Sequence, residues 1–217
     1  MRIETDFLVL GSGIAGLTYA LKVSEFGSVA VVTKKDRAES NTNYAQGGIA
    51  AVMGSDDSFE AHVADTLAAG DGLCHTDVVE AVVGSGPRLI EELVGLGARF
   101  TRSHKDGGEE FDLGREGGHS VSRVVHAQDL TGREVERALL STASRNPNIR
   151  IYENHVAVDL LTLGKLEHRR TRPDTCFGAY VYDRLSGEVR TFAANVTMIS
   201  TGGLGKVYLY TSNPDIA

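Results

Sequence analysis

The sequence contains little of what marks a disulfide-stabilised or membrane-spanning protein. Its 217 residues include no tryptophan and only two cysteines, Cys74 and Cys176. These cysteines are far apart and lack metal-ligand spacing, so we expect reduced thiols, no bound metal and a cytoplasmic location. The apolar stretch that begins at Phe7 is broken by glycines and by Lys22, which leaves it too short to span a membrane. No signal-peptide pattern follows Met1.

Positive charge is scarce relative to negative charge. Lysine and arginine total 22 residues against 29 aspartates and glutamates, which gives a formal net charge of -7. A protein that binds nucleic acid chiefly through its phosphates presents a basic stripe. The short cluster of Arg169, Arg170 and Arg172 is better explained as a solvated loop. The charge balance therefore excludes nucleic acid as the main partner.

Glycine is abundant, at 25 of 217 positions, and its first cluster has an informative context. Residues 7–10 and 29–32 predict buried strands, and residues 14–26 have helical spacing. The loop between the first strand and the helix consists of Gly11, Ser12, Gly13, Ile14, Ala15 and Gly16. Gly11 would permit a tight turn, Gly13 a close backbone approach to a pyrophosphate, and Gly16 close packing of helix on strand. With the phosphate charge at the helix N-terminus, this βαβ unit predicts dinucleotide binding.

The residue at the end of the second strand helps to distinguish FAD from NAD as the bound dinucleotide. Dinucleotide-binding enzymes commonly place an aspartate or glutamate there, where it holds ribose hydroxyls. This sequence has Lys34 at that point, and Asp36 follows in a segment that reads as a loop. The missing acid disfavours an NAD-dependent dehydrogenase. Spacing alone leaves two roles open for Lys34, a contact with the adenosine half of FAD or a solvated position.

The rest of the chain predicts helices and antiparallel strands around this unit. Helical spacing covers residues 58–69, 77–95 and 131–144, with the second helix interrupted or divided at residues 84–87. Strands are predicted at residues 149–152, 156–163, 177–182, 189–192 and 196–200, with a hairpin turn at residues 185–187. Residues 41–51 read as a ligand-contacting loop, and residues 99–122 read as irregular. The predicted fold class is therefore α/β: a Rossmann-like FAD-binding βαβ unit with a central parallel sheet, additional helices and an antiparallel meander or hairpin.

Several longer motifs resemble one family of flavoproteins. They are NTNYAQGGIAA at 41–51, DTLAAG at 65–70, REGGHS at 115–120, HAQDLTGREV at 126–135 and TGGLGKVY at 201–208. Together with the glycine loop and Thr33-Lys34, the first motif is similar to the flavoprotein family of succinate dehydrogenase, fumarate reductase and L-aspartate oxidase. The later motifs resemble the L-aspartate oxidase branch of that family. The resemblance covers essentially the whole chain.

The resemblance implies FAD as the cofactor and assigns residues to it. The pyrophosphate would be held at residues 11–16, and Lys34 would contact the adenosine side. The ribityl and isoalloxazine parts would lie along Asn41, Thr42, Asn43, Tyr44, Ala45, Gln46, Gly47 and Gly48. In the membrane-complex members of the family, a histidine at the position of Asn41 bonds covalently to the flavin. An amide cannot form that bond, so the flavin is expected to be noncovalent.

The resemblance also implies a reaction. L-aspartate would be oxidised to iminoaspartate, with oxygen or fumarate as the final acceptor, and quinolinate synthase would use the product in NAD biosynthesis. Glu116 would face the substrate ammonium, where a carboxylate could pair with it or assist its deprotonation. His119 would either help to bind a substrate carboxylate or be a structural histidine.

Two other functions compete with this interpretation. A soluble fumarate reductase or succinate-oxidising flavoprotein would use the same fold on a C4 dicarboxylate, although a carboxylate at Glu116 would repel a ligand without an ammonium group. A noncatalytic FAD-binding module belongs to a different class. By the resemblance, residues 1–217 form the first segment of an FAD-binding domain, without the capping domain and C-terminal helical region. We therefore expect little oxidase activity from the chain alone.

Overall fold

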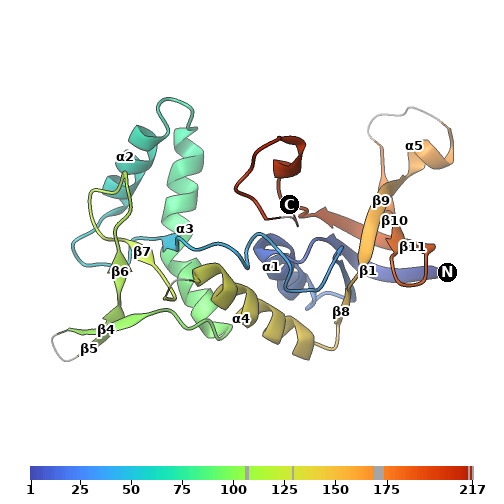
Figure 1. The fold of residues 1–217 in the computed structure, drawn as a ribbon, viewed down its shortest axis with the longest axis horizontal. Coiled ribbons are helices and arrows are strands. Elements are labelled where there is room, and N and C mark those ends of the chain that lie inside the picture. The colour runs from blue at the N-terminus through green and yellow to red at the C-terminus, as the bar shows by residue number, and fades with distance from the viewer. Residues whose placement is uncertain (106–107, 129, 169–173, 215, 217) are drawn as a thin grey trace. The chain divides into compact units, whose positions relative to one another are not determined.

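The computed structural model describes residues 1–105, 108–128, 130–168, 174–214 and 216, and Figure 1 traces the chain. The chain folds as two compact units. The first contains residues 1–44 and 139–217, and the second contains residues 45–138. The chain leaves the first unit after Tyr44 and returns to it within helix α4 (Thr131–Arg145). Among the helices of the described residues, none combines the length and apolarity needed to cross a membrane.

The first unit is built on a six-stranded sheet with the strand order β8-β2-β1-β11-β10-β9. Its strands are β1 (Arg2–Leu10), β2 (Val29–Val32), β8 (Ile149–Tyr152), β9 (His155–Thr162), β10 (Cys176–Asp183) and β11 (Glu188–Ile199). Strands β8, β2, β1 and β11 run parallel, whereas β10 pairs antiparallel with both β11 and β9. The predicted α/β fold, with its parallel sheet and antiparallel hairpin, is confirmed. Two short helical segments, α5 (Leu163–Leu166) and η1 (Gly205–Val207), complete this unit.

Both faces of the parallel strands are buried, which explains their continuous apolar runs. Leu8 and Leu10 lie in a core cluster with Phe192 and other side chains of β10 and β11. Val9 lies on the opposite face, in a cluster that includes Ala20 of helix α1 (Ile14–Val23). Successive residues of β1 therefore contact different layers, as the two-residue period of a strand requires. Helix α1 is shorter than predicted, since it ends at Val23 rather than near residue 26.

The two strands predicted at residues 189–192 and 196–200 are one continuous strand. β11 spans 12 residues, and its parallel register with β1 runs from Arg2–Thr191 to Leu10–Ile199. The prediction divided it because residues 193–195, two alanines and an asparagine, lack a strong strand preference. Pairing with a long neighbouring strand overrides that local weakness. Thus one strand links the antiparallel hairpin to the parallel core.

The second unit contains two helices, the first part of α4, and short antiparallel strands. The helices are α2 (Phe59–Ala69) and α3 (Thr76–Gly95). Strands β3 (Ile49–Ala50), β7 (Val124–Val125) and β6 (Leu113–Gly114) form one small sheet, and β4 (Arg102–Lys105) pairs with β5 (Gly108–Phe111). The interpretation of residues 99–122 as irregular was therefore wrong for these strands, whereas residues 115–122 contain no helix or strand. The hairpin strands are mostly polar, and the Arg102 guanidinium lies 4.4 Å from the centre of the Phe111 ring, a pairing that apolar periodicity does not reveal.

Two details of the helices also differ from expectation. Helix α3 is not divided at residues 84–87, and Pro87 lies inside it. Proline removes one hydrogen-bond donor, but the amphipathic face that includes buried Val83 and Ile90 continues across it. In α2, whose N-cap is Ser58, the buried residue is His62, although the helical spacing of Phe59, Val63 and Leu67 predicts an apolar buried face. His62 is buried there because its ring packs against that of His119, a residue outside the helix.

We predict that Gly84→Ala stabilises the second unit by about 0.5–1 kcal/mol, because alanine has the higher helix propensity. Gly84 is exposed inside α3, and a Cβ there would meet no atom within 4 Å. Urea unfolding measures the change. Gly86→Ala in the same helix is the matched control, since its Cβ would press on Ala51 at 3.3 Å. An equal gain in stability in both variants would contradict the idea that Ala51 leaves less room for a Cβ at Gly86 than there is at Gly84.

Candidate functional site

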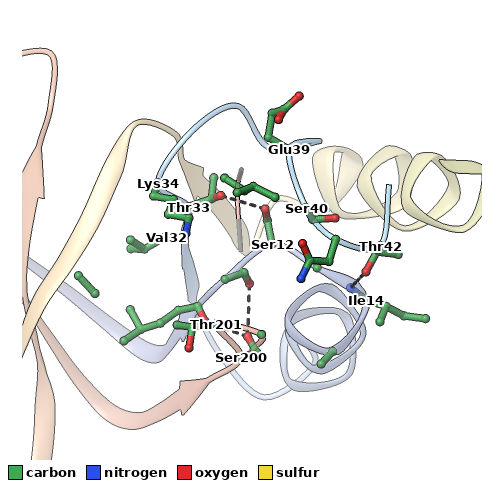
Figure 2. A pocket seen from close by; sticks show the side chains of 18 of the residues that line it. Ser12, Ile14, Val32, Thr33, Lys34, Glu39, Ser40, Thr42, Ser200 and Thr201 are labelled. Atoms are coloured by element: carbon green, nitrogen blue, oxygen red, sulfur yellow. Dashed lines mark hydrogen bonds between the residues drawn. The ribbon is translucent and has the colours of Figure 1, made fainter. Parts of the chain in front are cut away.

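The first unit has a cavity of about 360 Å³ at the carboxyl ends of its parallel strands (Figure 2). Ligands of open α/β sheets bind at this edge. Its lining comes from the glycine loop, the end of β2, the loop after β2, the start of β9 and the segment after β11. The lining residues are Leu10–Ala15, Val32–Lys34, Glu39–Thr42, His155–Ala157, Ser200–Gly202 and Ile216. The cavity thus joins segments that are widely separated in the sequence.

Glycine is required at two positions of this loop by close backbone contacts. Gly11 has a φ of +116°, and a Cβ there would overlap the carbonyl group of Ser200. A Cβ at Gly16 would overlap the carbonyl oxygen of Gly11. These contacts agree with the turning and packing roles that the sequence predicted for Gly11 and Gly16. Helix α1 therefore begins directly against the end of β1.

The N-terminus of α1 faces the cavity with backbone donors. The first N–H groups of a helix have no partner within the helix and, with the helix dipole, favour an anion. The Ile14 N–H donates to Thr42 Oγ1 at 3.1 Å, as Figure 2 shows. Thr42 is also the nearest neighbour of a Cβ at Gly13, at 3.4 Å. The glycine loop thus contacts the segment after β2, and together they form a cradle that fits a dinucleotide pyrophosphate.

Side-chain hydrogen bonds hold the glycine loop in place. Ser12 is buried, and its Oγ lies 2.9 Å from the Arg37 carbonyl oxygen and 3.0 Å from Thr33 Oγ1. On the other side, Ser200 Oγ donates to the Leu10 carbonyl oxygen at 3.0 Å. The Ser12 hydroxyl is therefore engaged within the protein.

An ion pair anchors the loop after β2. Arg37 Nε and Nη2 donate to the two carboxylate oxygens of Glu153 at 3.0 and 2.6 Å, and the Arg37 N–H donates to Glu153 as well at 2.9 Å. These hydrogen bonds, led by those of the guanidinium, lower the pKa of Glu153 to about 2. Lys34 lies beside this loop, lines the cavity and is exposed. The position suits the predicted adenosine contact, which stays a prediction.

Several residues that the sequence did not point to also line the cavity, among them Glu39, His155 and Ser200. No motif indicated His155. It lies at the cavity because the chain after β8, where β9 begins, pairs with the residue that follows β2. Its N–H donates to the Thr33 carbonyl oxygen at 3.0 Å. Ser200 could have been suspected, since it ends a predicted strand just before a glycine pair.

The predicted flavin loop, residues 41–48, is shared between the two units. Asn41 and Thr42 line the cavity of the first unit. The Asn43 N–H donates to Ser40 Oγ at 3.2 Å, and the Tyr44 hydroxyl donates to Glu39 at 3.0 Å, which raises the pKa of Tyr44. These bonds fix the loop where it leaves the first unit.

The remaining residues of that loop belong to the second unit. The Ala45 carbonyl oxygen accepts from the Gly132 N–H at 2.9 Å. Gln46 and Gly47 line a second, open hollow of about 470 Å³ with Gly114–Glu116, Val124, His126 and Gln128. Gly48 has a φ of +135°, and a Cβ there would lie 2.5 Å from the Val124 side chain. Gly48 is therefore required for packing.

Glu116 and His119 occupy different surroundings. Glu116 is exposed and lines the second hollow, where a Cβ built on Gly47 would lie 3.7 Å from Glu116 Oε1. Within the described residues, His119 is absent from the lining of that hollow. Its ring packs edge-to-face against buried His62, with 6.1 Å between the ring centroids. Burial, followed by the positive charge of Arg123, lowers the pKa of His62. These contacts favour the structural alternative for His119.

Comparison with known proteins identifies the class of site. The family model described as "FAD binding domain" matches residues 6–217. The chain belongs to this family, and its cofactor is FAD. The FrdA chain of Escherichia coli quinol fumarate reductase superposes with a TM-score of 0.88 and 30% identity, over all of this chain and 36% of that chain.

Among curated proteins, several relatives are L-aspartate oxidases. The enzyme of Pseudomonas aeruginosa is 47% identical over 216 residues, which cover 98% of this chain and 40% of the relative. L-aspartate oxidase 2-b of Nicotiana tabacum, a chloroplastic protein, is 47% identical over 212 residues, or 98% of this chain and 32% of the relative. The chain therefore spans about a third to two fifths of the length of these relatives.

We predict that Glu153→Gln lowers stability at neutral pH by about 0.5–1 kcal/mol, a value limited by solvent screening of a partly exposed pair. Because the pKa of Glu153 is depressed in the folded protein, its contribution is present above the ordinary value of 4.5 and is lost as pH falls towards 2. Chemical unfolding from pH 7 to pH 2 measures this loss. The variant should lose less stability over this pH range than the unmodified chain, by about 0.5–1 kcal/mol, whereas Glu25→Gln, at an exposed position, should lose as much as the unmodified chain.

Proposed function

We propose that this chain supplies the FAD site and part of the substrate site of an L-aspartate oxidase. The identity to enzymes of that name, 41–47% over almost the whole chain, carries the proposal. The position of the Glu116 carboxylate close to Gly47 supports it, because Gly47 belongs to the segment that we assign to the flavin. Product release to quinolinate synthase and a cytoplasmic location are further parts of this proposal.

The residues of the chain would bind and orient the two reactants. Backbone N–H groups of the glycine loop would hold the pyrophosphate, Lys34 the adenosine side, and residues 41–48 the remainder of the flavin. Glu116 would pair with the ammonium group of L-aspartate and could accept a proton from it. Bound FAD would supply a two-electron acceptor, which oxygen or fumarate would reoxidise. Loss of a hydride from Cα and a proton from nitrogen converts L-aspartate into iminoaspartate.

A fumarate reductase activity is the second candidate, and the similarity to the E. coli FrdA chain favours it. Fumarate and L-aspartate are both C4 dicarboxylates, so one pocket could accept either. Glu116 discriminates between them on electrostatic grounds. A carboxylate attracts the ammonium of L-aspartate but repels a ligand whose charges are all negative.

We predict that the flavin is bound noncovalently, because Asn41 replaces the histidine that links to flavin in related complexes. Purified chain loaded with FAD should be yellow, and acid precipitation should release all of the flavin into the supernatant. Absorbance of the two fractions measures this. Flavin that stays with the precipitated protein would contradict the assignment, and absence of colour would contradict FAD binding by these residues alone.

We predict that the chain supports L-aspartate oxidation when it replaces the matching 216 residues of the Pseudomonas aeruginosa enzyme. Glu116→Gln in this chimera should lower kcat/KM for L-aspartate by roughly 30-fold or more, since breaking a close charge pair costs about 2 kcal/mol or more. Hydrogen peroxide release and fumarate-dependent oxidation measure turnover. Glu110→Gln, on exposed strand β5, is the control. Oxidation of succinate in preference to L-aspartate would favour the second candidate.

A further inference from the structure

A buried ion-pair network connects helix α2 with the segment that carries Glu116. The side chain of Arg123 is fully buried. Its Nε and Nη2 donate to the two carboxylate oxygens of Asp57 at 2.9 and 2.8 Å, and its Nη1 donates to Asp65 Oδ2 at 2.7 Å. The Asp57 side chain is also fully buried, whereas that of Asp65 is 17% exposed. Charges this deeply buried are stable only when they are paired, so this arrangement is firmly fixed.

The two aspartates differ in what else they hold. Asp65 Oδ2 also accepts from both the N–H and the Oγ of Ser120, each at 2.7 Å. These two bonds, with help from Arg123, lower the pKa of Asp65 to about 2, so it is ionised at neutral pH. Asp57, by contrast, contacts residues 115–123 only through Arg123 in the part of the chain that the structure describes. Within the described residues, the Ser120 N–H is therefore held by Asp65 of α2, while Arg123 Nη2 donates to the Ser120 hydroxyl at 3.4 Å.

The segment between Glu116 and Ser120 depends on such an anchor. A glycine pair, Gly117 and Gly118, and then His119 separate the two residues, and Gly118 has a φ of +89°. Glycine restricts the backbone less than any other residue, so the pair contributes little rigidity of its own. Inside the turn, the His119 N–H donates to the Glu116 carbonyl oxygen at 3.2 Å. Arg115 Nε donates to the His119 carbonyl oxygen at 2.9 Å. Fixing Ser120 therefore fixes the turn that presents Glu116.

We propose that Asp65 is a positioning residue: through Ser120 it sets the backbone of residues 115–120 and thereby the place of the Glu116 carboxylate in the hollow beside Gly47. The importance of this placement for substrate rests on the proposed function. The assignment makes α2 part of the support of the site. It also gives a physical reason for a charged residue in α2 at a position where an apolar side chain would pack without desolvation cost.

We predict a specific change in amide hydrogen exchange for Asp65→Asn in the 217-residue chain. A neutral amide holds Ser120 and Arg123 less well than a carboxylate, so exchange across residues 116–120 should rise by about tenfold or more. Asp57→Asn is the matched control, because it weakens the Arg123 pairing without removing an acceptor from Ser120. After correction for the stability of the second unit by exchange in helix α3, it should change exchange in this segment by less than about twofold.

Ser120→Ala provides a gentler second variant, because it removes only the hydroxyl bonds to Asp65 and from Arg123 Nη2 and leaves both aspartates paired with Arg123. Its exchange in residues 116–120 should rise above that of the unmodified chain. An equal rise in the two aspartate variants, or no rise in either Asp65→Asn or Ser120→Ala, would overturn the positioning role.

The chimera links this geometry to substrate. Asp65→Asn should lower kcat/KM for L-aspartate by about tenfold, mainly through KM, with no change in the FAD released on denaturation. Asp57→Asn should have a smaller effect at equal folded fraction, and an equal effect would count against the proposal. If the unmodified chimera does not oxidise L-aspartate, the proposed function fails, whereas the exchange measurements still decide whether Asp65 fixes the segment.

Discussion

Close contact of backbone with backbone at the end of β1 is the constraint on which the nucleotide site depends. Gly11 and Gly16 approach each other and Ser200 so closely that neither position has room for a Cβ. This contact brings the N-terminus of α1 to the carboxyl edge of the sheet, where its N–H groups face the cavity. Strand β11 contributes Ser200 only because it pairs with β1 along its length. The phosphate cradle and the sheet therefore form together, and a side chain at either glycine would disturb both.

Charged pairs have a different task, which is to fix loops that lack regular structure. Arg37 and Glu153 hold the loop after β2 against the turn that precedes β9. In the second unit, Arg123 is held by two aspartates, and one of these also holds Ser120. Each network contacts a segment that contains or adjoins predicted site residues: the loop after β2 in the first unit and residues 115–120 in the second. Surface ion pairs contribute little to stability, but a bidentate or buried pair defines the geometry of the loop it joins.

Much of the fold was predictable because its strongest local patterns coincide with the tertiary structure. The βαβ unit, α4 and the hairpin between β10 and β11 each have apolar periodicity and suitable turn residues. The errors fall where local preference is weak or misleading. Residues 193–195 look like a break but pair with β1, Pro87 lies within an amphipathic helix that continues across it, and the β4–β5 hairpin is mostly polar. The pairing of residues 193–195 with β1 depends on residues remote in sequence, whereas the β4–β5 hairpin is a local pairing that lacks apolar periodicity.

The sequence by itself determined the class of ligand and the resemblance to a flavoprotein family, because glycine spacing and motif identity are local properties. It also selected Glu116, although the ligand contacts proposed for residues 41–48, Glu116 and His119 stay predictions. Only the tertiary structure brought His155 and Ser200 to the cavity, divided residues 41–48 between two units, and separated His119 from the hollow that Glu116 lines. It alone showed that Asp65, 55 positions before Ser120, accepts two hydrogen bonds from it. Side chains so far apart in the chain meet only after the backbone has folded, and no local pattern encodes their distance.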